Sequence, residues 1–116
     1  MLPKKYRLAK EKDFKQVFRS KKTFSQGFII IKLAENKLAF SRFGFVTGLK
    51  ISKKAVERNR IRRQMQEVIR INLADIQTGF DVVIMVKKEV LGKGYQEIEA
   101  AMAGPLRKAG LLLKVN

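Results

Sequence analysis

Basic side chains are densest between Lys50 and Arg63, where the sequence reads KISKKAVERNRIRR. Seven of these residues are Lys or Arg, and Glu57 is the only acidic residue among them. An Arg guanidinium can donate two parallel hydrogen bonds to a phosphate, and the backbone N–H groups at a helix N-terminus also favour phosphate. The chemistry that this segment predicts is therefore phosphate binding.

The spacing of these residues predicts which side of a helix would bind phosphate. We expect a helix over residues 53–74, and at about 100° per residue its polar residues share one stripe: Asn59, Arg62, Arg63, Gln66 and Arg70. A separate face carries the apolar residues Ile61, Met65, Val68, Ile69 and Ile76. The predicted polyanion-binding residues are Lys50, Lys53, Lys54, Arg58, Asn59, Arg60, Arg62, Arg63 and Arg70. A solvated basic face without a partner is the alternative.

The charge of the whole chain favours a polyanionic partner. Its 116 residues include 26 Lys and Arg against 10 Asp and Glu, a formal net charge of +16. Residues 1–70 hold 20 basic and 5 acidic residues, and therefore +15 of that total. Nucleic acid relieves such self-repulsion through counterion release. The sequence thus predicts a nucleic-acid surface in the first 70 residues.

The residue types present exclude most protein-borne catalysis. The chain has no His and no Cys, so it lacks a Ser-His-Asp triad, a thiolate nucleophile and the usual zinc ligands. Glu97 and Glu99 are two residues apart on an expected helix and diverge. We therefore expect no catalytic residue and no metal site in the chain itself.

The same composition bears on where the protein works. The absence of Cys fits a reducing compartment, the basic N-terminus is followed by no apolar stretch of a secretory signal, and no apolar run is long enough to cross a bilayer. We expect a cytoplasmic protein that does not bind membranes.

Apolar periodicity and turn residues predict the elements that position these side chains. We expect one domain over residues 1–116, with residues 1–9 as a basic N-terminal arm that can be flexible. The expected elements are a helix over 10–20, strands over 24–33 and 38–46, a helix over 53–74 with Ser52 as N-cap, a strand over 81–88, and a helix over 95–109 broken or kinked at Gly104-Pro105. The apolar run VVIMV in the strand over 81–88 indicates burial on both sides or a central position in the sheet. The two early strands are expected to be antiparallel neighbours. This order, αβ(β)αβα, describes an α+β two-layer sandwich.

The segment from Arg42 to Arg63, RFGFVTGLKISKKAVERNRIRR, resembles the signature of the protein subunit of bacterial ribonuclease P. The residues that carry the resemblance are Arg42, Gly44, Lys50, Ala55, Arg58, Asn59, Arg62 and Arg63. Further matches are Asp13, Phe14 and Phe18 near the N-terminus, the later DVVIMV strand and the KAGLL segment near the C-terminus. The resemblance covers nearly the whole chain.

This resemblance implies a fold, and it implies separate roles for the protein and for its RNA partners. The implied fold is the ribosomal protein S5 domain 2-like class, with a small, mostly antiparallel sheet and a left-handed β-α-β crossover. The implied partners are a catalytic ribonuclease P RNA, which requires Mg²⁺, and the 5′ leader of precursor tRNA. The protein itself is expected to hold no cofactor and to need no obligate protein partner. Its helix with Arg58, Asn59 and Arg62 is expected to lie against the RNA subunit.

The resemblance also implies an aromatic cleft for the leader. Phe14 and Phe18 lie one turn apart on the first helix, and stacking on Phe tolerates any base. The candidate leader-binding residues are Phe14, Phe18, Phe28, Ile31, Arg42 and Gln66. In the family Tyr often stands where this chain has Ile31, and Arg where it has Gln66, so we expect a weaker grip there. Core packing of Phe14 and Phe18 is the alternative.

Two other functions share the same charge and length. One is a structural ribosomal or general RNA-binding protein without a nuclease role. The other is a DNA-binding regulator that uses residues 53–70 as a recognition helix. Dependence of affinity on the 5′ leader, and a comparison of duplex DNA with structured RNA, distinguish these alternatives.

Overall fold

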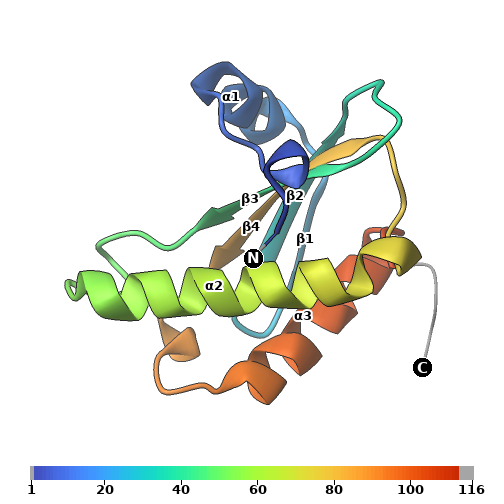
Figure 1. The fold of residues 1–116 in the computed structure, drawn as a ribbon. Helices are drawn as coiled ribbons and strands as arrows, with labels where there is room; N and C mark the ends of the chain where they lie inside the picture. The colour runs from blue at the N-terminus through green and yellow to red at the C-terminus, as the bar shows by residue number, and fades with distance from the viewer. Residues whose placement is uncertain (1, 113–116) are drawn as a thin grey trace.

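A mixed four-stranded sheet in the order β1-β2-β4-β3 forms the centre of the protein (Figure 1). The structure is a computed structural model that describes residues 2–112. Its strands are β1 Thr23–Gln26, β2 Ile29–Glu35, β3 Arg42–Val46 and β4 Phe80–Val86. The β1-β2 and β2-β4 pairs are antiparallel, and β3 is parallel to β4. The central position predicted for the VVIMV strand is confirmed.

The early strands differ from the prediction in three ways, the first being that the strand predicted over 38–46 begins only at Arg42. Residues 24–33 form a hairpin rather than one strand, because Gly27 has φ +57° and turns the chain between β1 and β2. The strands β2 and β3 are not neighbours, because β4 lies between them. The buried, apolar β4 can bond on both edges, whereas β3 stays at the edge of the sheet.

Three α-helices accompany the sheet within residues 2–112: α1 Glu11–Arg19, α2 Ala55–Asn72 and α3 Tyr95–Lys108. Short 3-10 turns lie at η1 Lys4–Tyr6, η2 Leu73–Asp75 and η3 Lys88–Val90. The predicted N-cap at Ser52 is wrong, because Lys54 is the N-cap and the Ser52 hydroxyl accepts a hydrogen bond from its N–H at 3.1 Å. The helix α3 continues through Pro105, where burial of Pro105 and Leu106 compensates for one missing hydrogen bond.

The observed order confirms the predicted α+β class. The parallel strands β3 and β4 are joined by α2, which forms the β-α-β crossover expected from the family resemblance (Figure 1). Two of the three ladders are antiparallel, as expected. This connection holds the whole basic segment in front of the edge strand β3.

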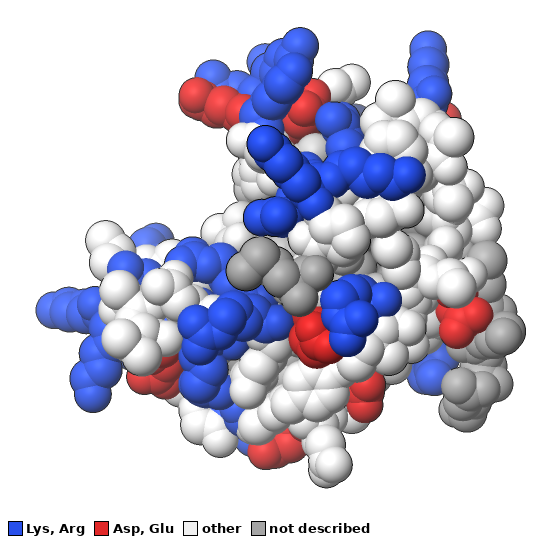
Figure 2. Space-filling view, viewed as in Figure 1, with Lys and Arg blue, Asp and Glu red and all other residues white. Residues whose placement is uncertain are grey.

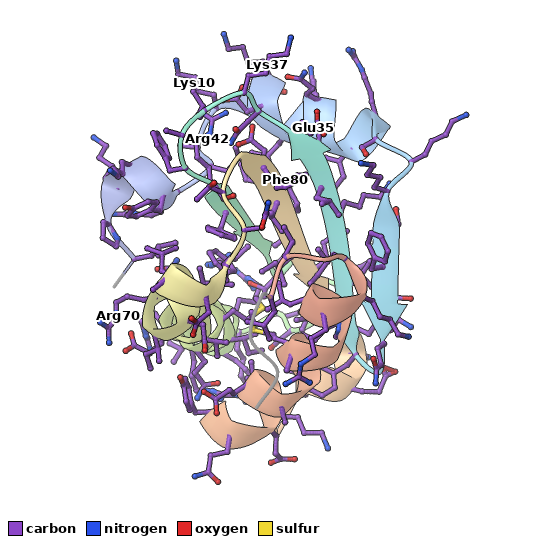
Figure 3. The ribbon with its side chains drawn as sticks, turned by 90° about the vertical axis from the view of Figure 1, so that its right-hand side faces the viewer. Lys10, Glu35, Lys37, Arg42, Arg70 and Phe80 are labelled. Atoms are coloured by element: carbon purple, nitrogen blue, oxygen red, sulfur yellow. The ribbon has the colours of Figure 1, made fainter. Side chains whose placement is uncertain are left out.

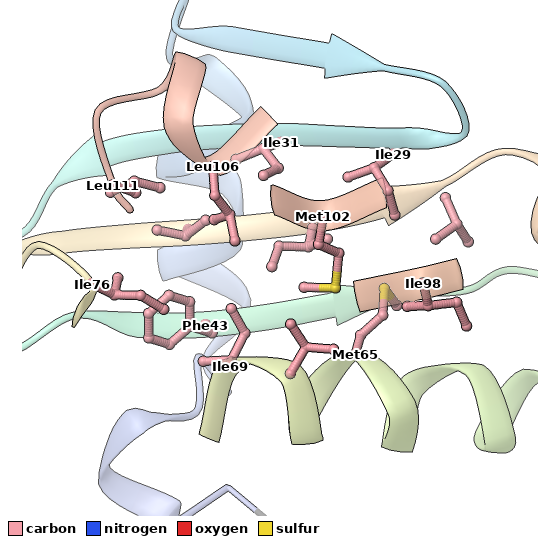
Figure 4. Close-up of a cluster of buried hydrophobic side chains, with 14 of the residues drawn as sticks. Ile29, Ile31, Phe43, Met65, Ile69, Ile76, Ile98, Met102, Leu106 and Leu111 are labelled. Carbon is pink, nitrogen blue, oxygen red and sulfur yellow. The ribbon is translucent and has the colours of Figure 1, made fainter. Parts of the chain in front are cut away.

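The main core lies between the sheet and the pair α2 and α3 (Figure 4). The sheet contributes alternate residues, among them Ile29, Ile31, Phe43 and Ile84. The apolar face predicted for α2 is buried, and α3 contributes Ile98, Met102 and Leu106. Burial of these side chains fixes the rotation of α2 about its axis, so its polar stripe must face away from the core.

The short helix α1 covers the opposite face of the sheet, where Val17, Leu8 and Val83 form a smaller buried cluster. The segment before α1 is not a free arm. Leu2 is fully buried in the main core, and the Leu8 N–H donates to the Phe43 carbonyl at 2.8 Å. Residues 2–9 therefore extend the edge of the sheet next to β3, and their basic side chains project from a packed backbone.

Among residues 2–112, no helix is both long enough and apolar enough to span a membrane.

Candidate nucleic-acid interface

The polar stripe predicted on α2 forms a basic surface in the structure. Asn59 and Arg63 are exposed and Arg62 is half-buried, and the Arg62 Nη2 donates a hydrogen bond to the Asn59 Oδ1. Figure 2 shows Lys and Arg gathered over the N-terminal half of α2 and again over the N-terminal segment and α1. The arrangement offers one oriented guanidinium and one freely exposed guanidinium to an anionic backbone.

Arg58 holds the loop that carries the three lysines. Its Nη1 donates to the Ser52 carbonyl at 2.9 Å, while its own carbonyl accepts a hydrogen bond from the Thr47 hydroxyl at 3.2 Å. The lysines Lys50, Lys53 and Lys54 are exposed on this loop. Arg58 is therefore a positioning residue in the structure, and the loop it fixes presents the cations.

The start of α2 suits an anion. Lys54 is the N-cap and supplies no side-chain hydrogen bond, so the first backbone N–H groups of the helix point outward without a capping side chain. Positive side chains are unfavourable beside this positive end of the helix dipole unless an anion is present. The concentration of cations at this end is accounted for if it meets phosphate.

Two predicted residues are directed elsewhere. The Arg60 Nη1 donates to the Lys93 carbonyl at 3.2 Å and to the Gln64 Oε1 at 3.0 Å, which directs Arg60 toward the loop before α3. Arg70 pairs with Glu67, and this hydrogen bond raises the pKa of Arg70 and lowers that of Glu67. Both arginines therefore have hydrogen-bond partners within the protein, and an anion would compete with these bonds.

A small pocket joins α1, β3 and α2. It has a volume of about 160 Å³, and its lining includes Phe14, Gly44, Arg62, Gln66 and Arg7. The Phe14 ring lies directly on Gly44, where an added Cβ would be only 2.5 Å from Phe14 Cε1. Glycine at position 44 therefore allows Phe14 to pack closely against the edge strand, next to the polar stripe of α2.

Phe18 continues the aromatic surface outward. Its ring stacks on Phe14 with centroids 6.5 Å apart and an interplanar angle of 27°. Phe18 is 43% exposed, whereas Phe14 is half-buried. The sequence left open whether these two rings pack in the core or line a cleft. In the structure Phe14 does both, because it packs on Gly44 and lines the pocket, whereas Phe18 presents its ring to solvent.

Two residues assigned to the cleft are in the core instead. Ile31 is 0% exposed under α3, and Phe28 packs against the same main core. The cross-strand pair Phe24 and Ile31 shows which face this is, because paired residues lie on the same side of a sheet. Burial alternates along β2, but alternation in the sequence could not show which face of the sheet α1 covers.

Arg42, also assigned to the cleft, makes a structural ion pair. Its Nε and Nη2 donate to the two carboxylate oxygens of Asp81 at 2.8 and 2.7 Å, and its Nη1 lies 3.4 Å from Asp13 Oδ2 on α1. The hydrogen bond to Asp81 raises the pKa of Arg42. Figure 3 shows Arg42 at the end of the sheet remote from Arg70. Arg42 therefore positions α1 on the sheet, and its fork is occupied by a carboxylate.

Residues that the sequence did not predict line the pocket on both sides of Phe14. Arg7 and Leu8 line the pocket because the N-terminal segment pairs with β3, and Phe45 lines it from β3 itself. No local pattern could have identified Arg7, because its position depends on a contact with residue 43. Within residues 2–112 no group of three or more His, Cys, Asp or Glu side chains is placed to hold a metal ion.

The comparisons with known proteins agree with one another. A family model described as Ribonuclease P matches residues 2–110. The ribonuclease P protein component of Syntrophomonas wolfei is 33% identical over 114 residues, covering 98% of this chain and 95% of that protein. That of Alkaliphilus oremlandii is 31% identical over 106 residues, covering 91% and 92%. The solved structure of the RNase P protein from Thermotoga maritima in complex with 1-(4-fluorophenyl)-2-thiourea has a TM-score of 0.81 at 26% identity, covering 88% of this chain and 98% of that chain.

Proposed function

Because this chain belongs to the ribonuclease P protein family, we propose that it binds the RNA subunit of that enzyme and the 5′ leader of precursor tRNA. The chain is a protein subunit of ribonuclease P, and an RNA partner follows from its place in a ribonucleoprotein. The proposal adds which surface meets which RNA, and it assigns cleavage of the leader to the RNA subunit.

The observation that carries the proposal is the joining of two surfaces in one pocket. Arg62 and Gln66 of α2 and Phe14 of α1 line the same cavity, although they are about fifty residues apart in sequence. A single-stranded segment can place a base against Phe14 and Phe18 while its phosphates lie beside Arg62. Stacking on an aromatic ring is sequence-tolerant, which suits leaders of many tRNA genes.

The outer side of the α2 stripe is left for the RNA subunit. Arg63 and Asn59 are exposed beside the loop with Lys50, Lys53 and Lys54, and this surface is continuous with the start of α2. Structured RNA presents closely spaced phosphates that such a surface can neutralise. The protein would then hold the leader on one side of α2 and the RNA subunit on the other.

The chemistry of cleavage would be supplied by the RNA subunit and the Mg²⁺ that it binds. The residues of this chain would orient the leader, neutralise its phosphates and keep it single-stranded. A protein that neutralises phosphates near the reaction lowers the Mg²⁺ concentration that the RNA needs. The cytoplasm, where precursor tRNA is made in bacteria, stays the predicted location.

Reconstitution tests the proposal. The protein is mixed with a bacterial ribonuclease P RNA, and cleavage of precursor tRNA is measured at low Mg²⁺ against the RNA alone. We expect faster cleavage and tighter binding of substrates that carry a leader. No stimulation would refute the proposal. Equal affinity with and without the leader would favour a general RNA-binding protein, and a preference for duplex DNA would favour a DNA-binding regulator.

Matched variants then separate the two surfaces. Arg63→Ala should weaken binding of the RNA subunit, because it removes an exposed cation from the stripe, whereas Arg107→Ala on α3 removes the same charge elsewhere and should not. Phe18→Ala should lower leader affinity about fivefold, the value of one stacking contact. Leu38→Ala, another exposed apolar side chain, is its control. Equal effects of a variant and its control would contradict the assignment of that surface.

A further inference from the structure

A second and larger pocket lies at the other end of α2. It has a volume of about 570 Å³, within the range of roughly 300–1,000 Å³ typical of small-ligand sites. The N-terminal segment, the loop between β2 and β3, and the turn after α2 enclose it. Its lining includes the buried side chains Phe43 and Ile76, which give it an apolar floor.

An aromatic pair forms one wall of this pocket. The rings of Tyr6 and Phe40 meet edge to face, with centroids 5.9 Å apart and an interplanar angle of 89°. The Lys5 Nζ lies 5.0 Å from the centroid of Tyr6 and 5.1 Å from that of Phe40. Two cation-π contacts thus hold an ammonium group at the aromatic wall.

The charge at the pocket is positive. Its lining residues include Lys5 and Arg70 and no carboxylate among the residues that the structure describes. Arg70 is hydrogen-bonded to Glu67, so much of its charge is balanced. Lys5 makes no ion pair with any residue between 2 and 112. The pocket therefore offers an apolar, aromatic interior beside one uncompensated cation.

This combination fits a flat ring that carries a phosphate. We propose that the pocket between η1, the β2–β3 loop and the end of α2 binds one unpaired nucleotide of RNA, with its base against Tyr6 and Phe40 and its phosphate on Lys5. The inference rests on the proposed function, because the nucleotide belongs to an RNA partner.

Continuity with the basic stripe supports this occupant. Arg70 is the last residue of the α2 stripe that begins at Asn59, and it also lines the pocket. Arg70 lies eleven positions after Asn59, a distance of about 16 Å along the helix axis. An RNA strand that follows the stripe toward the C-terminal end of α2 would pass the mouth of the pocket.

Titration of the full protein with adenosine 5′-monophosphate tests the proposal, with ring signals of Tyr6 and Phe40 followed by NMR. We expect saturable shifts of both rings, and binding at least several-fold weaker for ribose 5-phosphate, which lacks the base. Lys5→Gln should raise the Kd for the nucleotide about fivefold through loss of one exposed charge contact. Lys108→Gln removes the same charge from α3 and should leave the Kd unchanged.

A second variant blocks the pocket without touching the core. Ile71 is 55% exposed on the pocket wall, so Ile71→Glu should preserve the fold while placing a carboxylate where the phosphate approaches. Gln96→Glu makes the same change of net charge at an exposed site on α3. We expect loss of nucleotide binding for Ile71→Glu only. Circular dichroism and thermal unfolding check that each variant is folded.

The outcomes distinguish this inference from the proposed function. Nucleotide binding that is insensitive to both Lys5→Gln and Ile71→Glu would overturn the pocket assignment. Ribose 5-phosphate binding as tightly as the nucleotide would overturn it too, because a phosphate site alone would then explain the data. Cleavage assays with wild-type protein and ribonuclease P RNA run in parallel: stimulation there, without nucleotide binding, refutes the pocket and leaves the proposed function standing.

Discussion

Replacement of Gly44 by Ala is the sharpest test of how the cleft is built. The added Cβ would lie 2.5 Å from Phe14 Cε1 and 2.6 Å from Cζ, whereas carbon atoms in favourable contact are about 3.5 Å apart. The Phe14 ring must therefore retreat by about 1 Å. Phe14 is half-buried and can move outward, so we expect a destabilisation of about 1 kcal/mol, at the lower end of overpacking costs.

Urea and thermal unfolding measure this cost. One kcal/mol corresponds to a fall in Tm of about 4 °C for a domain of this size. Gly48→Ala is the matched control, because its Cβ would meet no atom within 4 Å. The control also contains the entropic effect that Ala has on the unfolded chain, which is favourable to stability. The difference between the two variants therefore reports the clash with Phe14.

A double-mutant cycle identifies the clashing partner. In a Phe14→Ala background the ring is gone, so Gly44→Ala should cost nothing beyond the Gly48→Ala control. Gly44→Ala should also lower leader affinity, because the displaced ring intrudes on a pocket of only about 160 Å³. If Gly44→Ala destabilises the protein equally with and without Phe14, the reasoning about this contact is wrong.

Three further predictions concern the ionisable groups. Asp81→Asn removes the carboxylate that pairs with the half-buried Arg42, and the free energy of unfolding measured in urea should fall by about 3 kcal/mol. A decrease below about 1 kcal/mol would contradict the structural role of the pair. Arg70 lowers the pKa of Glu67, so the ion pair contributes to the free energy of unfolding above pH 4.5 and this contribution is lost as the pH falls. In Glu67→Gln the free energy of unfolding should therefore fall less steeply between neutral and acid pH. An unchanged dependence on pH would count against the pair. Burial and the nearby carboxylate of Glu99 raise the pKa of Tyr95, so the neutral hydroxyl contributes stability that is lost as the pH rises above 10.0. Tyr95→Phe should therefore reduce the loss of stability measured by urea unfolding above pH 10.0, and an unchanged alkaline loss would contradict this role of Tyr95.

Most helices could be predicted from the sequence because their signals are local. The apolar spacing of Ile61, Met65 and Val68 predicts both α2 and the face it buries, and the structure confirms both. The central position of β4 followed from its uninterrupted apolar run. The partner of each strand did not follow, because the pairing of β2 with β4 joins residues about fifty positions apart and has no local signature.

The candidate site shows the same division. The stripe with Asn59, Arg62 and Arg63 was predicted from helical spacing, and in the structure Asn59 and Arg63 are exposed while Arg62 is half-buried. The cleft was predicted only in part, because Phe14 lies in the pocket while Ile31 lies on the other side of the sheet. Which face of a strand meets which helix depends on the turn at Gly27 and on the docking of α1, and neither can be read from alternation alone.

The sequence by itself determined the charge, the basic stripe and the lack of residues for protein-borne catalysis, because these depend on residue type and on spacing within one helix. Only the tertiary structure decided which cations have protein partners and which are exposed. Arg42 is held by Asp81 and Arg60 by the Lys93 carbonyl, whereas Arg63 faces solvent. The reason is physical: a guanidinium forms its short hydrogen bonds with whichever oxygen the fold places within reach, and in this protein those oxygens come from segments remote in the chain.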